Sequence, residues 1–407
     1  MTLTYNQFGQ RTAIHSGTGT RAMIPELFRG LHAKRIVLFS DAGLQSAGIV
    51  DKIASLFDLP KQQHGPELVG IYLDIQQDAS SECVNAAARY AREVGADALL
   101  AVGGGSVLDA VKGVKYCLAK GITDIKSIIT GGILVENWPQ AQPMSIPHVA
   151  VPTTAGTGSE VSPIAVIYNE QLKIKSNIIH PFINADMAVL DPDLTVGLPP
   201  FITAFTGFDA LTHAIEALAS PKATVLTDAY ALHAIRIISK QLPAVVKDGA
   251  YLPARMEMLQ ASLIAITAFS FALNAIPVHN FAHAYGALFR IPHGLANAVF
   301  LPEVMEHIPQ LYLPKSFELA QALGIDTNGK QREHLLKDSV HKIKELQQQV
   351  DLPADFRDYN INASQLEATI KAVSKDPAAR SFPIPAETIQ TIGMKVIFNK
   401  NEVLTST

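Results

Sequence analysis

The sequence predicts an α/β first half built on a parallel sheet, followed by an all-helical second half. Up to about residue 198, short apolar segments typical of strands alternate with helical segments. Such alternation is typical of a parallel sheet covered by helices. Beyond Leu198-Pro199-Pro200 the strand patterns stop and long helical patterns follow. We therefore predict two domains, residues 1–197 and 198–407.

Individual elements of the first half follow from short hydrophobic runs and the turns that end them. Each predicted strand is rich in Val, Ile, Leu or Ala, and the run that begins at Ala96 ends in glycines. The predicted strands are 35–40, 96–105, 148–154 and 188–192, and the predicted helices between them are 41–57, 82–94 and 106–119.

The second half is expected to be helical because its apolar residues recur at helical spacing. Its longest apolar stretch, Ala261–Ala275, is interrupted by polar residues and is too short to span a bilayer. It is therefore predicted to be a buried core helix. The predicted helices are 201–219, 226–241, 253–275, 335–349 and 363–374.

Composition excludes several classes of protein. With 48% hydrophobic and 17% charged residues, the 407-residue chain has enough apolar surface for large buried cores. A net charge of −4 gives no basic face, so we expect no nucleic-acid partner. The N-terminal segment lacks the basic start and apolar run of a secretory signal, and Cys83 and Cys117 have no metal-type spacing. We expect a cytoplasmic protein without a membrane partner.

The strongest chemical signal lies in the helical half. Asp209 and His213 are four residues apart, which on a helix places both side chains on one face. His279 and His283 have the same spacing, and His293 follows a proline in a predicted turn. Asp209, His213, His279 and His293 could therefore close around one divalent ion.

The alternative is that these residues are structural. A single Asp-x-x-x-His on a helix is common, but three histidines within Val278–His293 are harder to explain without a metal, because a buried imidazole without a partner is costly. Imidazole with carboxylate suits Fe²⁺, Zn²⁺, Mn²⁺ or Ni²⁺. We favour Fe²⁺, which expands its coordination readily, with Zn²⁺ as the alternative. With one carboxylate the site would stay positive and stabilise an alkoxide.

Two loops in the first half are typical of nucleotide binding. Gly103-Gly104-Gly105-Ser106 joins a predicted strand to a helix, where backbone N–H groups can bind a pyrophosphate, although it can equally be a tight connection. The loop from Pro152 to Glu160 is rich in hydroxyls and also follows a strand. Asp41 could bind ribose hydroxyls and repel a 2′-phosphate, which favours NAD over NADP, or it could be a helix N-cap.

These motifs resemble those of the iron-containing (group III) alcohol dehydrogenase family. The matching segments are GGGSVLDAVK, PTTAGTGSEVS, GFDALTHAIEA and HNFAHAYGALFRIPHGLANAV, within about residues 35–305. The resemblance implies a dehydroquinate-synthase-like architecture, with an N-terminal dinucleotide-binding domain, a C-terminal metal domain and a cleft between them.

The resemblance also implies a role for individual residues. Asp209, His213, His279 and His293 match the metal ligands, and His283 matches a histidine beside the nicotinamide that can relay a proton. Asp41 matches the position associated with NAD preference. The other positions that match cofactor-lining residues are Gly104, Gly105, Ser106, Thr153, Thr154, Thr157 and Lys175.

The chain departs from the family pattern in two segments that face the substrate pocket in relatives. Asp78-Ala79-Ser80 stands where many relatives have Asn-Pro-Thr. Asp376-PAARSFPIP replaces a pattern that often contains Cys and Thr-Asn-Pro. The identity of the substrate therefore does not follow from the resemblance.

The sequence thus predicts an NAD- and metal-dependent alcohol dehydrogenase that acts on a small alcohol or aldehyde. Relatives commonly form dimers or larger assemblies, so we expect a homo-oligomer. Alternatives are an enzyme similar to glycerol dehydrogenase or to the dehydroquinate-synthase-type lyases, and a non-catalytic NAD-binding sensor. A lyase would cause no net change in NADH, and a sensor would not need a Lewis-acid metal.

Overall fold

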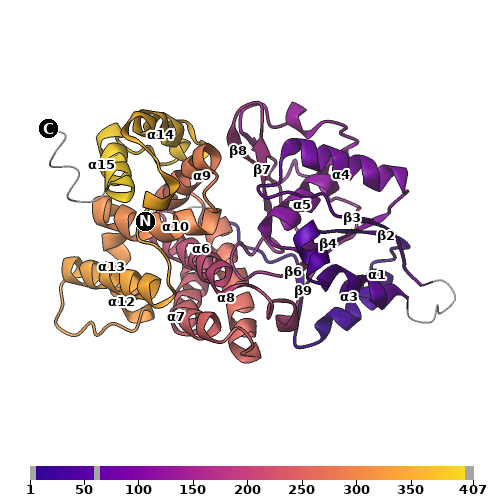
Figure 1. Ribbon diagram of the computed structural model, residues 1–407, viewed down its shortest axis with the longest axis horizontal. Coiled ribbons are helices and arrows are strands. Elements are labelled where there is room, and N and C mark those ends of the chain that lie inside the picture. Colours follow the sequence, from indigo (N-terminus) through magenta and orange to yellow (C-terminus); the bar gives the residue numbers. More distant parts are fainter. Residues whose placement is uncertain (1–5, 59–64, 399–407) are drawn as a thin grey trace. The chain divides into compact units, whose positions relative to one another are not determined.

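The computed structural model describes residues 6–58 and 65–398, and Figure 1 labels most of its helices and strands. The first five residues of the N-terminal segment discussed above lie outside this range. The chain forms two compact units, one of Met1–Leu198 with Ala250–Leu263, the other of Pro199–Gly249 with Ile264–Thr407. Among the described residues, no helix combines the length and apolar composition that crossing a membrane requires.

A six-stranded parallel sheet forms the centre of the first unit. A smaller three-stranded sheet has the order β5-β8-β7, and its pair β7–β8 is antiparallel. The order of the large sheet is β1-β9-β6-β4-β2-β3. The strands are β1 Ala13–Ser16, β2 Arg35–Phe39, β3 Glu67–Tyr72, β4 Ala98–Gly103, β5 Ile133–Val135, β6 His148–Pro152, β7 Ile164–Asn169, β8 Ile174–Ile179 and β9 Met187–Leu190.

Helices cover both faces of the large sheet, as Figure 1 shows. Alternate residues of a strand point to opposite faces, so Val37 and Phe39 of β2 pack with α4 and α5, whereas Ile36 and Leu38 pack with α1 and α3. This arrangement explains why β4, which is buried along its whole length, contains no polar residue. The helices are α1 Ile24–Gly30, α2 Ala42–Ser46, α3 Ile49–Ala54, α4 Ser81–Glu93 and α5 Gly105–Lys120.

The structure differs from the sequence prediction in two places within this unit. The helix predicted over 41–57 is two short helices, because Gly48 between them adopts a left-handed backbone conformation with φ of 73°. Strands β1 and β3 and the whole three-stranded sheet were not predicted. Strands β1 and β3 contain no fully buried residue, and β8 carries three polar residues in a row, so these three lack the continuous apolar run by which the other strands were predicted.

The described part of the chain after Leu198 contains helices and no strand. Within the second unit, α6 packs against α7 and α10, and α10 also packs against α9. The helices are α6 Pro200–Ala219, α7 Val225–Lys247, α8 Leu252–Phe271, α9 Pro277–Phe289, α10 His293–His307, α11 Pro309–Tyr312, α12 Ser316–Ala322, α13 Arg332–Gln349, α14 Ala363–Lys375 and α15 Ala386–Ile397.

Candidate functional site

Helix α6 carries two of the predicted metal ligands on one face. Asp209 and His213 lie one turn apart and are 2% and 5% exposed. Asp209 Oδ1 lies 4.0 Å from His213 Nε2. The helix is apolar around most of its circumference, so both polar side chains are held inside the second unit rather than in solvent.

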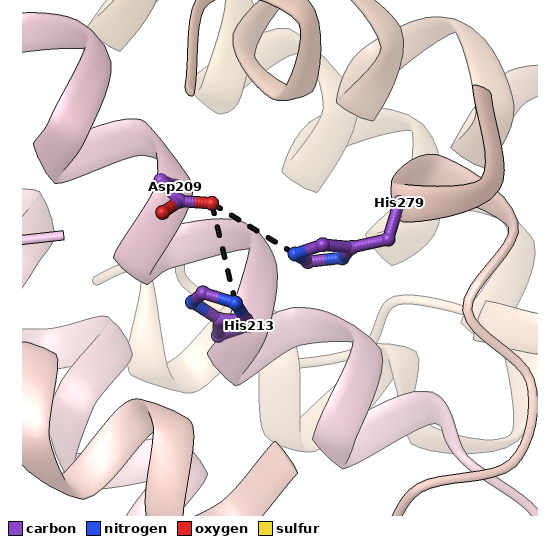
Figure 2. Close-up of side chains that lie close together, drawn as sticks. All are labelled: Asp209, His213 and His279. Atoms are coloured by element: carbon purple, nitrogen blue, oxygen red, sulfur yellow. Dashed lines mark ion pairs between the residues drawn. The ribbon is translucent and has the colours of Figure 1, made fainter. Parts of the chain in front are cut away.

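Helix α9 brings a third predicted ligand to the same point. His279 Nε2 lies 3.8 Å from Asp209 Oδ1, and Figure 2 shows the carboxylate facing both imidazoles. The rings of His213 and His279 are stacked, with centroids 4.6 Å apart. One ligand atom from each of Asp209, His213 and His279 lies within 4.8 Å of the other two. Their donor atoms are therefore close enough to share one cation.

The fourth predicted ligand, His293, is the first residue of α10 rather than part of a turn. Its Nε2 lies 3.5 Å from Asp209 Oδ1, and its side chain is the most exposed of the four, at 23%. The next residue explains how α10 comes so close to α6. A Cβ at Gly294 would lie 2.4 Å from the backbone oxygen of Phe205, so only glycine permits this approach.

The donor set suits a divalent transition metal. One carboxylate and three imidazoles, without a thiolate, favour Fe²⁺ or Zn²⁺ over softer ions. The two cysteines, Cys83 and Cys117, are buried in the first unit. Buried polar groups that face one another are costly unless each has a partner, and a shared cation is such a partner. The four residues therefore fit the metal that the sequence resemblance implies.

His283 borders this cluster but faces a different carboxylate. It lies one turn after His279 on α9, and its ring stacks on that of His293 with centroids 5.3 Å apart. Its Nδ1 lies 3.5 Å from Oδ2 of Asp376, whose Oδ1 accepts a hydrogen bond from the backbone N–H of Ala378. Sequence analysis noted Asp376 only as the start of an unusual segment and did not predict this contact.

In the first unit, the two predicted nucleotide loops lie side by side at the carboxyl ends of adjacent strands. Gly103 of β4 pairs with Pro152 of β6, and Thr153 donates its N–H to the Gly103 carbonyl at 3.1 Å. Gly104 is the N-cap of α5, and a Cβ there would be 3.4 Å from the Thr154 side chain. The first-turn N–H groups of α5, which can bind an anion, therefore lie next to a hydroxyl-rich loop.

Contacts among three further residues connect β8 to the start of α5. Lys175 of β8 is 6% exposed, and its Nζ lies 2.8 Å from Asp78 Oδ1. The backbone N–H of Asp78 donates to the Ser106 hydroxyl at 3.1 Å. Asp78 thus links Lys175 to the glycine-rich loop.

Asp41 follows β2, the neighbour of β4 in the sheet. Its Oδ1 accepts the N–H of Leu44 at 2.9 Å, so Asp41 is the N-cap of α2. This bond uses only Oδ1, so Oδ2 of Asp41 can still bind a ribose hydroxyl. The N-cap interpretation is therefore confirmed, and the interpretation as a ribose ligand stays a prediction.

Comparison with known proteins decides the family. The model of the iron-containing alcohol dehydrogenase family matches residues 11–192, and that of the C-terminal domain of the Fe-containing alcohol dehydrogenase family matches residues 203–394. The chain is 34% identical over 373 residues to long-chain-alcohol dehydrogenase 1 of Geobacillus thermodenitrificans strain NG80-2, with 91% of each chain covered. The chain belongs to the iron-containing alcohol dehydrogenase family.

Other members of the iron-containing alcohol dehydrogenase family extend the comparison. The chain is 28% identical to the NAD-dependent methanol dehydrogenase of Bacillus methanolicus, over 92% of this chain and 95% of that one. The crystal structure of a 1,3-propanediol oxidoreductase is 30% identical, with a TM-score of 0.88 over 97% of this chain and 100% of that chain. The predicted family and fold class are confirmed, and the protein is an oxidoreductase of this family.

In this member of the iron-containing alcohol dehydrogenase family, Glu216 also contacts the cluster of predicted ligands. Its Oε2 lies 2.5 Å from Nδ1 of His279, and its Oε1 accepts the N–H of Val278 at 2.6 Å. Burial raises the pKa of Glu216 well above its usual value, and the N–H of Val278 opposes that shift. A cation nearby would favour the ionised carboxylate. Sequence analysis missed Glu216, although its spacing from Asp209 and His213 places it on their face of the helix.

Asn297 is the other polar neighbour that sequence analysis missed. It is fully buried on α10, one turn after His293. Its Nδ2 donates to Asp209 Oδ1 at 2.7 Å and lies 3.3 Å from His293 Nε2. The same Nδ2 also lies 3.4 Å from His279 Nε2, so Asn297 contacts three predicted ligands, which come from three helices.

Proposed function

We propose that this protein is an NAD-dependent alcohol dehydrogenase or aldehyde reductase that uses a divalent metal, with Fe²⁺ favoured, and acts on small alcohols or aldehydes. One observation carries the proposal: Asp209 Oδ1 lies within 4.0 Å of an imidazole nitrogen from each of three histidines, which come from three helices. We assign residues 1–197 to NAD binding and 198–407 to metal binding.

We assign Asp209, His213, His279 and His293 as the residues that hold the ion. A divalent cation there supplies a Lewis acid that polarises a hydroxyl or carbonyl oxygen. The surroundings of the ligands are apolar on one side, because the ring of Phe269 lies 4.8 Å from the rings of both His213 and His279. This apolar contact excludes water and strengthens electrostatic interactions with the substrate.

The first unit supplies the groups that would hold NAD. The N–H groups of Gly105 and Ser106 begin α5 and would bind the pyrophosphate, and the hydroxyls of Thr153, Thr154 and Thr157 lie in the adjoining loop. Lys175 and Asp41 would bind ribose hydroxyls. NAD dependence is supported by the methanol dehydrogenase relative, which is itself NAD-dependent.

Alcohol oxidation transfers a hydride from the substrate carbon to NAD⁺ and releases one proton. His283 would accept that proton at Nε2, and the Asp376 carboxylate, 3.5 Å from Nδ1, would then favour the protonated imidazole. In the reverse direction His283 would return the proton to the carbonyl oxygen. Cytoplasmic location and assembly into a homo-oligomer stay predictions of the sequence.

Turnover by anaerobically purified, Fe²⁺-loaded protein tests the proposal. We expect NADH absorbance to rise with NAD⁺ and short alcohols, and to fall with NADH and aldehydes. H293A should lose both bound metal and turnover, whereas H341A, a control variant of an exposed histidine on α13, should keep both. A H293A enzyme with full metal content and turnover would refute the assignment. No NADH change with any substrate would favour a lyase or a sensor.

A further inference from the structure

Glu216 completes a row of three acidic or imidazole side chains along one face of α6. Asp209, His213 and Glu216 are spaced by four and then three residues, which is the repeat of a helix face. Glu216 is fully buried. Unlike the other two, it reaches away from the shared centre of the cluster and contacts the first turn of α9.

Both oxygens of this carboxylate have a defined partner on α9. Oε1 accepts the backbone N–H of Val278, which lies in the first helical turn, where N–H groups lack an intrahelical acceptor. Oε2 contacts Nδ1 of His279 at 2.5 Å. Because each oxygen is used, the carboxylate fixes the start of α9 and the plane of the His279 ring together.

The contact also selects the tautomer of His279. With a cation in the site Glu216 is ionised, and an ionised carboxylate can only accept hydrogen bonds, so Nδ1 then carries the proton. The lone pair is then on Nε2, the nitrogen that lies 3.8 Å from Asp209 Oδ1. Only this tautomer can donate an electron pair toward the point that the other predicted ligands face.

We propose that Glu216 is a positioning residue that holds His279 in its metal-binding tautomer and orientation and thereby sets the affinity of the metal site. This inference rests on the proposed role of His279 as a ligand.

E216Q tests the inference because an amide cannot reproduce both contacts. If its oxygen faces Val278, its NH₂ meets Nδ1 of His279 and favours the wrong tautomer. If its oxygen faces His279, its NH₂ meets the N–H of Val278. We expect E216Q apoprotein to bind Co²⁺ 10- to 100-fold more weakly than wild type in chelator competition, the range typical of such outer contacts, with the thermal midpoint of the apoprotein little changed.

E303Q is the matched control. Glu303 is a buried glutamate of α10 in the same unit and does not contact a predicted ligand. Its donor atoms lie close to those of Glu306 and His307, but Lys344 and Lys395 already neutralise the two carboxylates, so no cation is expected there. E303Q is expected to lower thermal stability and to keep wild-type Co²⁺ affinity. A general loss of packing would instead weaken Co²⁺ binding in both variants.

Co²⁺ affinity of E216Q within twofold of wild type would overturn the inference. H279A separates this failure from failure of the proposed function. If H279A loses Co²⁺ and E216Q does not, only the role of Glu216 is wrong, whereas wild-type binding by H279A would refute the metal site itself.

Should E216Q not fold, E216D makes the same test, since the shorter side chain keeps the charge but withdraws it from Nδ1. At least a tenfold loss is expected, and unchanged affinity would overturn the inference.

Discussion

Gly105 and Thr157 lie in direct contact at the start of α5: a Cβ at Gly105 would be 2.5 Å from Thr157 Cγ2 and 2.9 Å from its Oγ1. The contact joins the glycine-rich loop to the threonine-rich loop. It gives the glycine a packing reason in addition to the one predicted from the sequence, which was access of the backbone to a pyrophosphate.

G105A should therefore destabilise the protein by about 1–3 kcal/mol and raise KM for NAD⁺, because the new methyl group forces the two loops apart. Adding T157A should restore much of the stability, since the nearest remaining side-chain atom would be the Cβ at 3.1 Å. Denaturant unfolding of G105A, T157A and the double variant measures this. Strictly additive losses would show that the two residues do not interact.

H283A should lower kcat by about 100-fold or more and leave the metal content unchanged, because His283 is assigned to proton transfer and not to metal binding. The contact of its Nδ1 with Asp376, away from Asp209, supports that distinction. Metal analysis and steady-state kinetics on the same preparation measure both effects. Loss of metal in H283A would instead place this histidine among the ligands.

D41N should reduce the preference for NAD over NADP about tenfold, which corresponds to ~1.4 kcal/mol. Asparagine caps a helix as well as aspartate does, so the bond to Leu44 is kept while the charge that repels a 2′-phosphate is removed. The ratio of kcat/KM for the two cofactors is the measurement. A wild-type enzyme that uses NADP as well as NAD would already contradict the assigned role of Asp41.

The free energy of unfolding should fall as pH rises, because Glu160 is buried. Burial raises its pKa from 4.5 to about 7, so the folded state binds the proton more tightly than the unfolded state does. Its stabilising contribution is complete below about pH 4.5 and is lost as pH rises to about 7. E160Q cannot ionise, so its stability relative to wild type should increase over this interval by about 3 kcal/mol at most. Unfolding curves at several pH values test this, and a constant difference would count against it.

Local periodicity was sufficient to predict which side chains of the candidate metal site share a helix face. The spacing of Asp209 and His213, and of His279 and His283, depends only on the geometry of one helix. Those helices form as predicted. The glycine-rich loop was likewise predictable, because a strand, a glycine run and a helix are consecutive in the sequence.

Only the tertiary structure decided which side chains meet across helices. His279 and His283 are equivalent by spacing, yet the packing of α9 directs one toward Asp209 and the other toward Asp376. Glu216 and His279 are 63 residues apart, and their contact depends on how α6 and α9 pack. The helical repeat decides in which direction each side chain of one helix points. The distance between two helices depends on the side chains packed between them, as with Gly294 against Phe205, and no local pattern encodes it.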